Sequence, residues 1–445
     1  MASFEEKLAA AGVRVPEVYL PARSADWAAW AVVACDQYSS EREYWEGVKD
    51  LVGAAPSTLN LIFPECYLED PDKDQRILHI QAAMRDYLDQ GVLASAGGGF
   101  ILVERRTPYE GEPRKGLVIA VDLEMYEYGR GSSSLIRPTE GTIVERLPPR
   151  MKIRRGAPLE LPHIMLLIDD PGRTVIEPLY AARESLAKIY DFELMTGSGH
   201  VRGWQVAGEA ALSRIADALT RLADPAVFKR NYGEDGVLLF AVGDGNHSLA
   251  TAKAVWEEIK QASVGKPGID RHPARWALVE LVNIYDQGLP FHPIHRVLFQ
   301  ADEEALLEEL AGHGDCVIEE AARPAALAAV DEGAAEHRFA LMSAGATRLI
   351  RFPRPKAKLA AGTIQEFLDG YLARHPGTGI DFIHGRESLE SLAGKPGNLG
   401  IYLPPIDKSG FFGTVIRDGV MPRKTFSMGE APEKRFYVEA RKILP

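Results

Sequence analysis

Residues 237–259 read VLLFAVGDGNHSLATAKAVWEEI and predict a strand, a glycine turn and a helix in direct succession. The residues from Val237 to Val242 are all apolar, which is typical of a strand buried on both faces. Gly243 and Gly245 permit a sharp turn, and Ser248 is a favourable N-cap for the helix that follows. The apolar positions of this helix fall on one face: Leu249, Ala252, Trp256 and Ile259.

The turn between this strand and this helix is the first candidate site. Backbone N–H groups at a helix start, reached through a glycine turn, bind phosphate or carboxylate, so Gly245, Asn246 and Ser248 are predicted ligands of such a group. Asp244 and His247 carry the carboxylate and imidazole that serve as acid/base groups or metal ligands near neutral pH. The alternative is a plain turn in which Asp244 caps the helix and His247 is exposed.

Strand and helix patterns also alternate outside this segment and predict a mixed fold of the α/β (α+β) class. Apolar runs predict strands at residues 27–35, 100–105, 116–123 and 277–284, and apolar residues three and four apart predict a helix at 75–93. The turn residues 169–172 predict a hairpin between strands at 164–168 and 174–176. Asp36 directly follows the first strand, and a strand end is a usual place for a functional side chain.

The composition changes near residue 300 and indicates two domains. Residues 301–346 are rich in Ala, Glu and Leu, which predicts surface helices, and glycines separate short strands toward the C-terminus. We therefore expect an α+β core over residues 1–300, which contains the turn, and a smaller α+β domain over residues 301–445 that packs on it.

The charge and the cysteines exclude several classes of protein. The net charge is −12, and because binding to a nucleic-acid backbone needs a basic field, DNA binding is the least expected activity. Cys35, Cys66 and Cys316 are far apart and odd in number, which argues against a disulfide framework. Glu5 and Glu6 stand where a secretion signal has basic residues, and the longest apolar runs are about half the ~20 residues of a membrane helix. We therefore expect a cytoplasmic protein without a membrane segment.

A basic stretch from Arg137 to Arg155 is the second candidate site. It holds six basic residues against two acidic ones, and the planar guanidinium group matches phosphoryl oxygens. Arg137 and Arg146 are the predicted phosphate ligands, and Glu140 is a candidate base. The alternative is a solvated loop with charge pairs.

Two further candidates lie in the C-terminal third of the sequence. His292, His295 and Arg296 follow a buried strand and are candidate substrate ligands, whereas Pro293 keeps the two histidines off a regular helix and disfavours a zinc site. From residue 417 to 442, seven basic residues stand against four acidic ones. Lys424 and Thr425 are predicted to line a phosphate pocket there, and the alternative is a positive surface face.

Several familiar catalytic motifs do not occur in the sequence. It has no G-x-x-x-x-G-K-S/T phosphate loop, no H-E-x-x-H, no C-x-x-C and no G-x-S-x-G. The glycines Gly197, Gly199 and Gly203 miss the dinucleotide-binding spacing by one residue. These absences weaken predictions of an NTPase, zinc protease, hydrolase or Rossmann enzyme.

The sequence resembles the DUF1015 family, an uncharacterised group placed near the ParB/sulfiredoxin-like superfamily. The resemblance rests on stretches spread over nearly the whole chain: WAVVACDQY best from Trp30, IRPTEGTIVERLPPR, LPHIMLLIDDP, GDGNHSLATA, ALVELVNIYD with FHPIHRVLF, and MPRKTFSMGEAPEKRFY. It implies a core in which an acidic turn rich in glycine and histidine holds nucleotide phosphates, as in free-serine kinases. Asp244, Gly245 and His247 match that turn, whereas Ser248 stands where many relatives have arginine.

The resemblance and the candidate residues together predict a phosphoryl-transfer enzyme acting on a small hydroxylated or phosphorylated metabolite, with serine or phosphoserine as the leading expectation. The enzyme would be a kinase, phosphatase or phosphotransferase, with Asp36, Glu140 or His247 as base. Mg²⁺ held by Asp244 or Asp36 and a nucleotide, ATP or ADP, are the expected cofactors. The alternative is a non-catalytic sensor of a nucleotide or phosphometabolite, and a homodimer is one oligomeric state left open.

Overall fold

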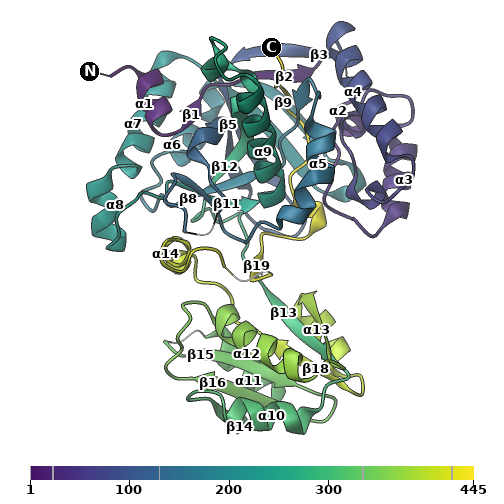
Figure 1. The fold of residues 1–445 in the computed structure, drawn as a ribbon, viewed down its shortest axis with the longest axis vertical. Coiled ribbons are helices and arrows are strands. Elements are labelled where there is room, and N and C mark those ends of the chain that lie inside the picture. Colours follow the sequence, from purple (N-terminus) through teal and green to yellow (C-terminus); the bar gives the residue numbers. More distant parts are fainter. Residues whose placement is uncertain (1, 23–24, 130, 333–334, 422–423) are drawn as a thin grey trace. The chain divides into compact units, whose positions relative to one another are not determined.

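The computed structural model describes residues 2–22, 25–129, 131–332, 335–421 and 424–445 (Figure 1). The chain forms two compact units, one of Met1–Leu289 with Gly429–Pro445 and one of Pro290–Met428. The chain therefore leaves the first unit before the predicted boundary at residue 300 and returns to it near the C-terminus. The return depends on pairing between residues far apart in the sequence, which a change in composition does not reveal.

The first unit is built on a mixed sheet, which is nine-stranded over the described residues and confirms the predicted α+β class. Its order is β6-β11-β8-β12-β5-β4-β10-β9, with β1 beside β5. The strands are β1 Val13–Arg14, β4 Phe100–Arg106, β5 Arg114–Asp122, β6 Ile136–Pro138, β8 Met165–Ile168, β9 Ala187–Glu193, β10 His200–Val206, β11 Phe240–Asp244 and β12 Trp276–Asn283. β11 runs parallel to β6 and antiparallel to β8.

Helices surround this sheet, and α5 and α9 lie side by side on one of its faces (Figure 1). Arg155, just after α5, joins them by donating from Nε to Oε2 of Glu258 in α9 over 2.7 Å. The helices of the first unit are α1 Phe4–Ala10, α2 Trp27–Trp30, α3 Arg42–Val52, α4 Lys73–Asp89, α5 Leu147–Arg154, α6 Glu177–Ala181, α7 Glu209–Leu222, α8 Pro225–Tyr232 and α9 Asn246–Ala262.

Most predicted elements of the first unit are confirmed, and two strands are wrong. The hairpin of β4 and β5, the helix α4 and the strand β12 form as predicted. Residues 27–30 form α2 instead of a strand, because the Asp26 carboxylate accepts the Ala28 N–H at 3.0 Å and caps a helical turn. Residues 174–176 form no strand, because Asp170 Oδ2 accepts the Val175 N–H at 3.0 Å and β8 already pairs with β11 and β12.

The returning segment Gly429–Pro445 pairs with N-terminal parts of the first unit. The Ala34 N–H donates to the Arg435 carbonyl at 2.9 Å, and the Tyr437 N–H donates to the Val32 carbonyl at 2.8 Å. Further on, β20 Arg441–Lys442 pairs with β7 Leu159–Glu160. This pairing brings residues 32–36 and 434–437 together, far apart as they are in the sequence.

Buried charges hold the returning segment against the sheet. Arg435 is 5% exposed and forms ion pairs with Glu280 and Glu439, which are 1% and 0% exposed. Its Nε also donates to the Pro162 carbonyl at 2.9 Å. Burial by itself raises the pKa of Glu280, but the nearby guanidinium groups of Arg435 and Arg114 hold that pKa below its ordinary value. These charges are compensated only while all partners are present.

The second unit is a sheet with a core on each face. The order is β14-β16-β15-β18-β13-β17, with β19 beside β13. Phe339 and Leu341 of β15 pack in the core with α10 and α12, and Ala340 and Met342 pack in the core with α11 and α13. The elements are β13 His292–Phe299, β14 Val317–Glu320, β15 His337–Met342, β16 Thr347–Phe352, β17 Gly379–His384, β18 Asn398–Tyr402, β19 Phe426–Ser427, α10 Glu303–Ala311, α11 Arg323–Asp331, α12 Ala360–Arg374, α13 Arg386–Ala393 and α14 Lys408–Asp418.

Candidate functional site

The predicted turn lies at one edge of the sheet in the first unit. β6 runs parallel to β11, so the residues after both strands lie at this edge, and Thr139 Oγ1 donates to the Val242 carbonyl at 2.7 Å. β8 runs antiparallel to β11, so the residues just before β8, including His163, lie at the same edge. Gly245 has φ of +77°, and a Cβ there would lie 3.0 Å from Ile164 Cα. The turn therefore requires glycine.

The N-terminus of α9 lies at the turn. Gly245 is the N-cap, and no side chain among the described residues caps the helix. The predicted N-cap, Ser248, instead lies inside the helix as its third residue. The first N–H groups of a helix have no partner within it, so they are available to an anion. Asn246 also has a buried Oδ1 without a hydrogen-bond partner in the described part of the chain.

Asp244 ends β11 and is held by two groups. Its Oδ1 accepts the Gly245 N–H at 2.9 Å, and its Oδ2 lies 3.2 Å from Lys434 Nζ. The side chain of Asp244 is 27% exposed. Burial raises its pKa, but the nearby Lys434 and His163, with the hydrogen bonds, hold the pKa below its ordinary value. Asp244 is thus a carboxylate that positions an ammonium group beside the turn.

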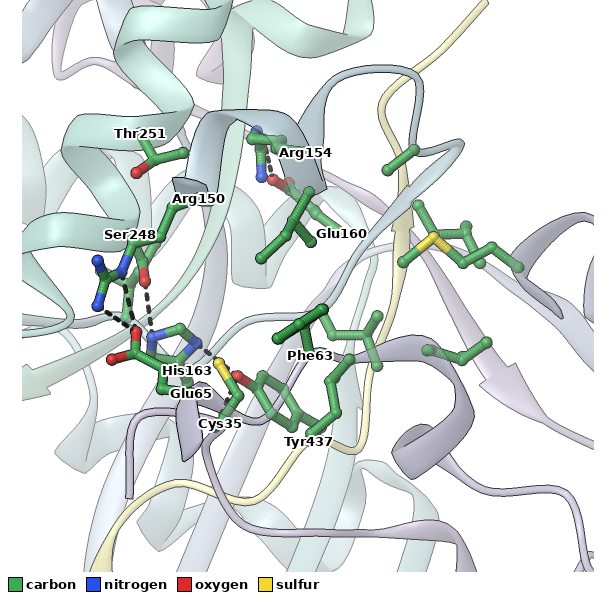
Figure 2. A pocket seen from close by; sticks show the side chains of 18 of the residues that line it. Cys35, Phe63, Glu65, Arg150, Arg154, Glu160, His163, Ser248, Thr251 and Tyr437 are labelled. Atoms are coloured by element: carbon green, nitrogen blue, oxygen red, sulfur yellow. Dashed lines mark hydrogen bonds and ion pairs between the residues drawn. The ribbon is translucent and has the colours of Figure 1, made fainter. Parts of the chain in front are cut away.

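His163 connects Ser248 to Tyr437, as Figure 2 shows. Its Nε2 lies 2.8 Å from Ser248 Oγ, and its Nδ1 lies 2.8 Å from the Tyr437 hydroxyl. The Asp36 carboxylate lies 3.9 Å from Nε2. The Tyr437 hydroxyl accepts the Cys35 N–H at 3.1 Å. The imidazole is therefore held from both nitrogens with the serine hydroxyl on one side.

A cavity of about 150 Å³ opens beside this group (Figure 2). Most of its lining is apolar, from residues such as Leu61, Phe63, Met84, Ile153 and Leu159. Its polar lining includes Cys35, His163, Ser248 and Tyr437, and an ion pair in which Arg150 Nε donates to Glu65 Oε1 at 2.9 Å. A small organic group can thus lie against the serine and the imidazole.

His247 and Glu140 also lie at this edge of the sheet. The Ile143 N–H donates to His247 Nε2 over 3.3 Å, so the neutral imidazole carries its proton on Nδ1. Glu140 follows Thr139 at the end of β6 and so lies near the end of β11. The structure thus brings the predicted residues Asp36, Glu140, Asp244, Gly245, Asn246, His247 and Ser248 to one edge.

The first basic stretch is neutralised by acids from elsewhere in the sequence. Arg137 donates to carbonyl oxygens, from Nε to Ser134 at 2.8 Å and from Nη2 to Gly236 at 2.9 Å. Four others form ion pairs: Arg150 with Glu65, Lys152 with Asp74, Arg154 with Glu160 and Arg155 with Glu258. Arg146 is exposed. Arg137 thus connects the backbone at Ser134 to the backbone at Gly236.

The second basic stretch is divided between the two units. Arg435 and Arg441 are buried in ion pairs with Glu280, Glu439 and Glu160, so they form no positive surface face. Lys424 is exposed and Thr425 is buried, and both belong to the second unit. Arg423, counted in this stretch, lies outside the described residues.

The FHPIHR residues contribute to β13 in the second unit. His295 is 2% exposed, accepts the Leu403 N–H on Nδ1 at 3.1 Å and stacks on Tyr402. Arg296 is 0% exposed, and its Nε donates to Gln365 Oε1 at 3.2 Å. His292 is exposed at the start of the strand. His295 and Arg296 thus pack inside the second unit. Their hydrogen bonds satisfy polar groups that are buried there.

We expect the second unit to lose stability on mild acidification because of His295. Burial, with the charges of Arg296 and His384, lowers the pKa of His295 to about 4. The unfolded chain therefore binds more protons between pH 6.5 and 4, and stability falls as the pH falls through that window, by about 2 kcal/mol from pH 7 to 5. Hydrogen exchange of β13 and β18 peptides measures this loss. His295→Asn should remove most of it, and an unchanged pH dependence in this variant would contradict the assignment.

The described residues do not form a ready magnesium site. No three His, Cys, Asp or Glu side chains among them are grouped so as to hold a metal ion. Both Asp244 oxygens already have partners in Gly245 and Lys434. A divalent ion at Asp244 would have to displace Lys434 and take its remaining ligands from phosphate and water.

The residues that the sequence alone did not indicate are His163, Tyr437, Lys434 and Arg150. His163 precedes a predicted strand, in the stretch LPHIMLLIDDP, and a search of strand starts as well as strand ends would have found it. In the sequence, Lys434 and Arg150 stand out only as members of the two basic stretches. Tyr437 has no local signal, because it reaches the site through long-range pairing of the returning segment.

Comparison with known proteins gives a family and distant structural likenesses. The family model described as "Protein of unknown function (DUF1015)" matches residues 17–371. A conserved hypothetical protein from Pyrococcus furiosus is 11% identical, with 74% of this chain and 95% of that chain covered and a TM-score of 0.36. A free serine kinase in complex with AMP is 12% identical, with 74% and 91% covered and a TM-score of 0.36.

A mutant free serine kinase in complex with ADP is 12% identical, with 76% of this chain and 98% of that chain covered and a TM-score of 0.38. No curated protein matches the chain. Within the described part of the chain, every helix is too short or too polar to cross a bilayer.

Proposed function

The chain belongs to the DUF1015 family, and we propose that it transfers a phosphoryl group to or from a small hydroxylated metabolite. The observation that carries the proposal is the turn at the end of β11, where the N-terminus of α9, without a side-chain cap among the described residues, lies beside the Asp244–Lys434 pair and the Ser248–His163 pair. Phosphoryl transfer needs mainly positioning and positive charge around the phosphoryl oxygens. The turn supplies both.

The phosphoryl group is assigned to the first turn of α9. N–H groups there and the positive end of a long helix favour an anion. An ammonium group has three N–H donors, so Lys434 can hold the Asp244 carboxylate and a phosphoryl oxygen at once. Lys434 thus joins Arg137, Arg146 and Lys424, the cations that the sequence predicts as phosphate ligands.

Acid/base chemistry is assigned to Asp36 and His163. The two side chains lie 3.9 Å apart, and His163 lines the cavity together with Ser248. Glu140 and His247 lie at the same edge and are the further candidates for proton transfer. A general base within reach of an acceptor hydroxyl accelerates its attack on phosphorus.

The proposed substrates are serine or phosphoserine with ATP or ADP as the nucleotide partner. The support for this choice is the resemblance of the turn to nucleotide-phosphate turns of the ParB/sulfiredoxin-like kind, on residues Asp244, Gly245 and His247. The cavity of about 150 Å³ suits a small substrate group. We place such chemistry in the cytoplasm.

³¹P NMR with the full-length protein tests the proposal. Phosphoserine is supplied alone and with ADP, and serine is supplied with ATP and with ADP, each with Mg²⁺. We expect release of phosphate or transfer to or from the nucleotide. Unchanged spectra together with saturable nucleotide binding by calorimetry would contradict it and favour a ligand sensor, since a helix N-terminus can bind an anion without any chemistry.

Asp244→Asn should lower the observed rate about a hundredfold. The asparagine keeps an acceptor for the Gly245 N–H but loses the charge that positions Lys434. Initial rates from the same ³¹P spectra measure the effect. Asp235→Asn is the matched control, because Asp235 is 84% exposed and pairs with Lys229 on the surface. Equal rates in the two variants would contradict the role of Asp244.

A further inference from the structure

We propose that Ser248 is a nucleophile that takes the phosphoryl group covalently, with His163 as its general base. This inference rests on the proposed function and names a residue that the sequence assigned only to phosphate binding. Its geometric basis is the distance of 2.8 Å between Ser248 Oγ and His163 Nε2, which is the hydrogen-bond reach of a nucleophile and its base.

The place of Ser248 in α9 suits a phosphorylated serine. It is the third residue of the helix and so belongs to its first turn. A negative phosphoryl group on this oxygen meets the positive end of the helix. Ser248 is half-buried and lines the cavity, so a donor reaches it from that side.

Tyr437 sets the tautomer that general-base catalysis requires. To accept the serine proton on Nε2, a neutral His163 must carry its own proton on Nδ1. In the proposed arrangement, this Nδ1–H donates to the Tyr437 oxygen, 2.8 Å away. The same oxygen accepts the Cys35 N–H at 3.1 Å. Tyr437 is thus a positioning residue that fixes the imidazole from behind.

The surroundings keep this arrangement intact. Burial raises the pKa values of the Cys35 thiol and the Tyr437 phenol, so both stay protonated at neutral pH. Asp36, 3.9 Å from His163 Nε2, stabilises the imidazolium that forms when the serine proton is transferred. The carboxylate of Asp244 contributes to the same field.

The transfer balances in two steps. In the first step, Ser248 Oγ attacks phosphorus while its proton moves to His163 Nε2. The Oγ–P bond forms and the bond between phosphorus and the donor oxygen breaks. The donor oxygen then takes the proton from His163. In the second, an acceptor hydroxyl or water gives its proton to His163 and attacks phosphorus. The P–Oγ bond then breaks, and Ser248 regains its proton from His163.

Diisopropyl fluorophosphate is the probe for the nucleophile. Attack by an activated serine forms an Oγ–P bond and releases fluoride, so peptide mass spectrometry shows which residue reacts. We expect labelling of Ser248, no label at this position in Ser248→Ala, and labelling at least about 100-fold slower in His163→Gln. Ser263→Ala, at the C-terminal end of α9, is the matched control and should label at the wild-type rate.

Tyr437→Phe tests whether Tyr437 positions the His163 ring through its hydroxyl group or only packs against it. The ring stays but the acceptor for Nδ1–H is lost, so we expect slower labelling of Ser248 and a shifted midpoint in the pH dependence of its rate. ¹⁵N spectra of the His163 ring should show a change of tautomer. Circular dichroism shows that each variant is folded.

The outcomes separate this inference from the proposed function. Turnover in the ³¹P spectra that persists in Ser248→Ala would overturn the covalent step and leave phosphoryl transfer standing. Labelling of Ser248 that requires His163, in a protein without phosphoryl turnover, would support the nucleophile and overturn the proposed reaction. Absence of labelling in the folded wild-type protein, or labelling that is independent of His163, would overturn the inference.

Discussion

Lys434→Met is expected to lower the rate of phosphoryl transfer by about 100- to 1000-fold, the effect of removing one preorganised donor from a transition state. Lys434 Nζ lies 3.2 Å from Asp244 Oδ2 and is the cation that the structure places at the turn. Methionine keeps most of the side-chain volume, so the change removes charge with little loss of packing. Initial rates in the ³¹P assay measure the effect.

Lys442→Met is the matched control for this variant. Lys442 lies on the same returning segment, is exposed and contacts the ring of Tyr19 instead of the turn. We expect its rate to equal that of the wild type. A rate for Lys434→Met within a factor of a few of this control would show that Lys434 does not contact the phosphoryl group.

Arg435→Met is expected to destabilise the first unit by about 3–5 kcal/mol, the cost of leaving buried charges without their partner. The substitution removes the guanidinium that pairs with Glu280 and Glu439, both nearly fully buried. Urea unfolding followed by tryptophan fluorescence reports on this unit selectively, because all the tryptophans belong to it: Trp27, Trp30, Trp45, Trp204, Trp256 and Trp276.

The pH dependence of this variant should have the opposite sign to that of the wild type. In the wild type, Glu280 has a lowered pKa, so its contribution is present above the ordinary pKa of glutamate and is lost as the pH falls below it. In Arg435→Met, the buried carboxyl groups have fewer cations beside them, so burial raises their pKa values. The stability of this variant should therefore rise as the pH falls from 7 toward 5.

A combined variant, Arg435→Met with Glu280→Gln and Glu439→Gln, tests whether unpaired buried carboxylates cause the loss of stability. It should recover part of the lost stability, because no buried charge is left without a partner. A cost below about 1 kcal/mol for Arg435→Met alone, the range of surface pairs, would contradict the assignment of a buried network.

The local elements around the site were predictable because their signals are local. Six successive apolar residues from Val237 to Val242 indicate a buried strand, which forms over Phe240–Asp244, and Gly245 supplies the positive φ that the turn needs. The hairpin of β4 and β5 follows from two apolar runs close in the sequence. These patterns depend on neighbours a few residues apart, so the sequence determined the α+β class, the turn and its predicted residues Asp244 to Ser248.

The partners of that turn were decided by the tertiary structure. His163 reaches Ser248 because β8 runs antiparallel to β11, and Lys434 and Tyr437 arrive only through the returning C-terminal segment. Folding also compensates charges within the two basic stretches, since Glu65 pairs with Arg150 and Glu280 pairs with Arg435. Charge along a chain does not show which opposite charges folding will bring beside it, because strand order and direction set those distances.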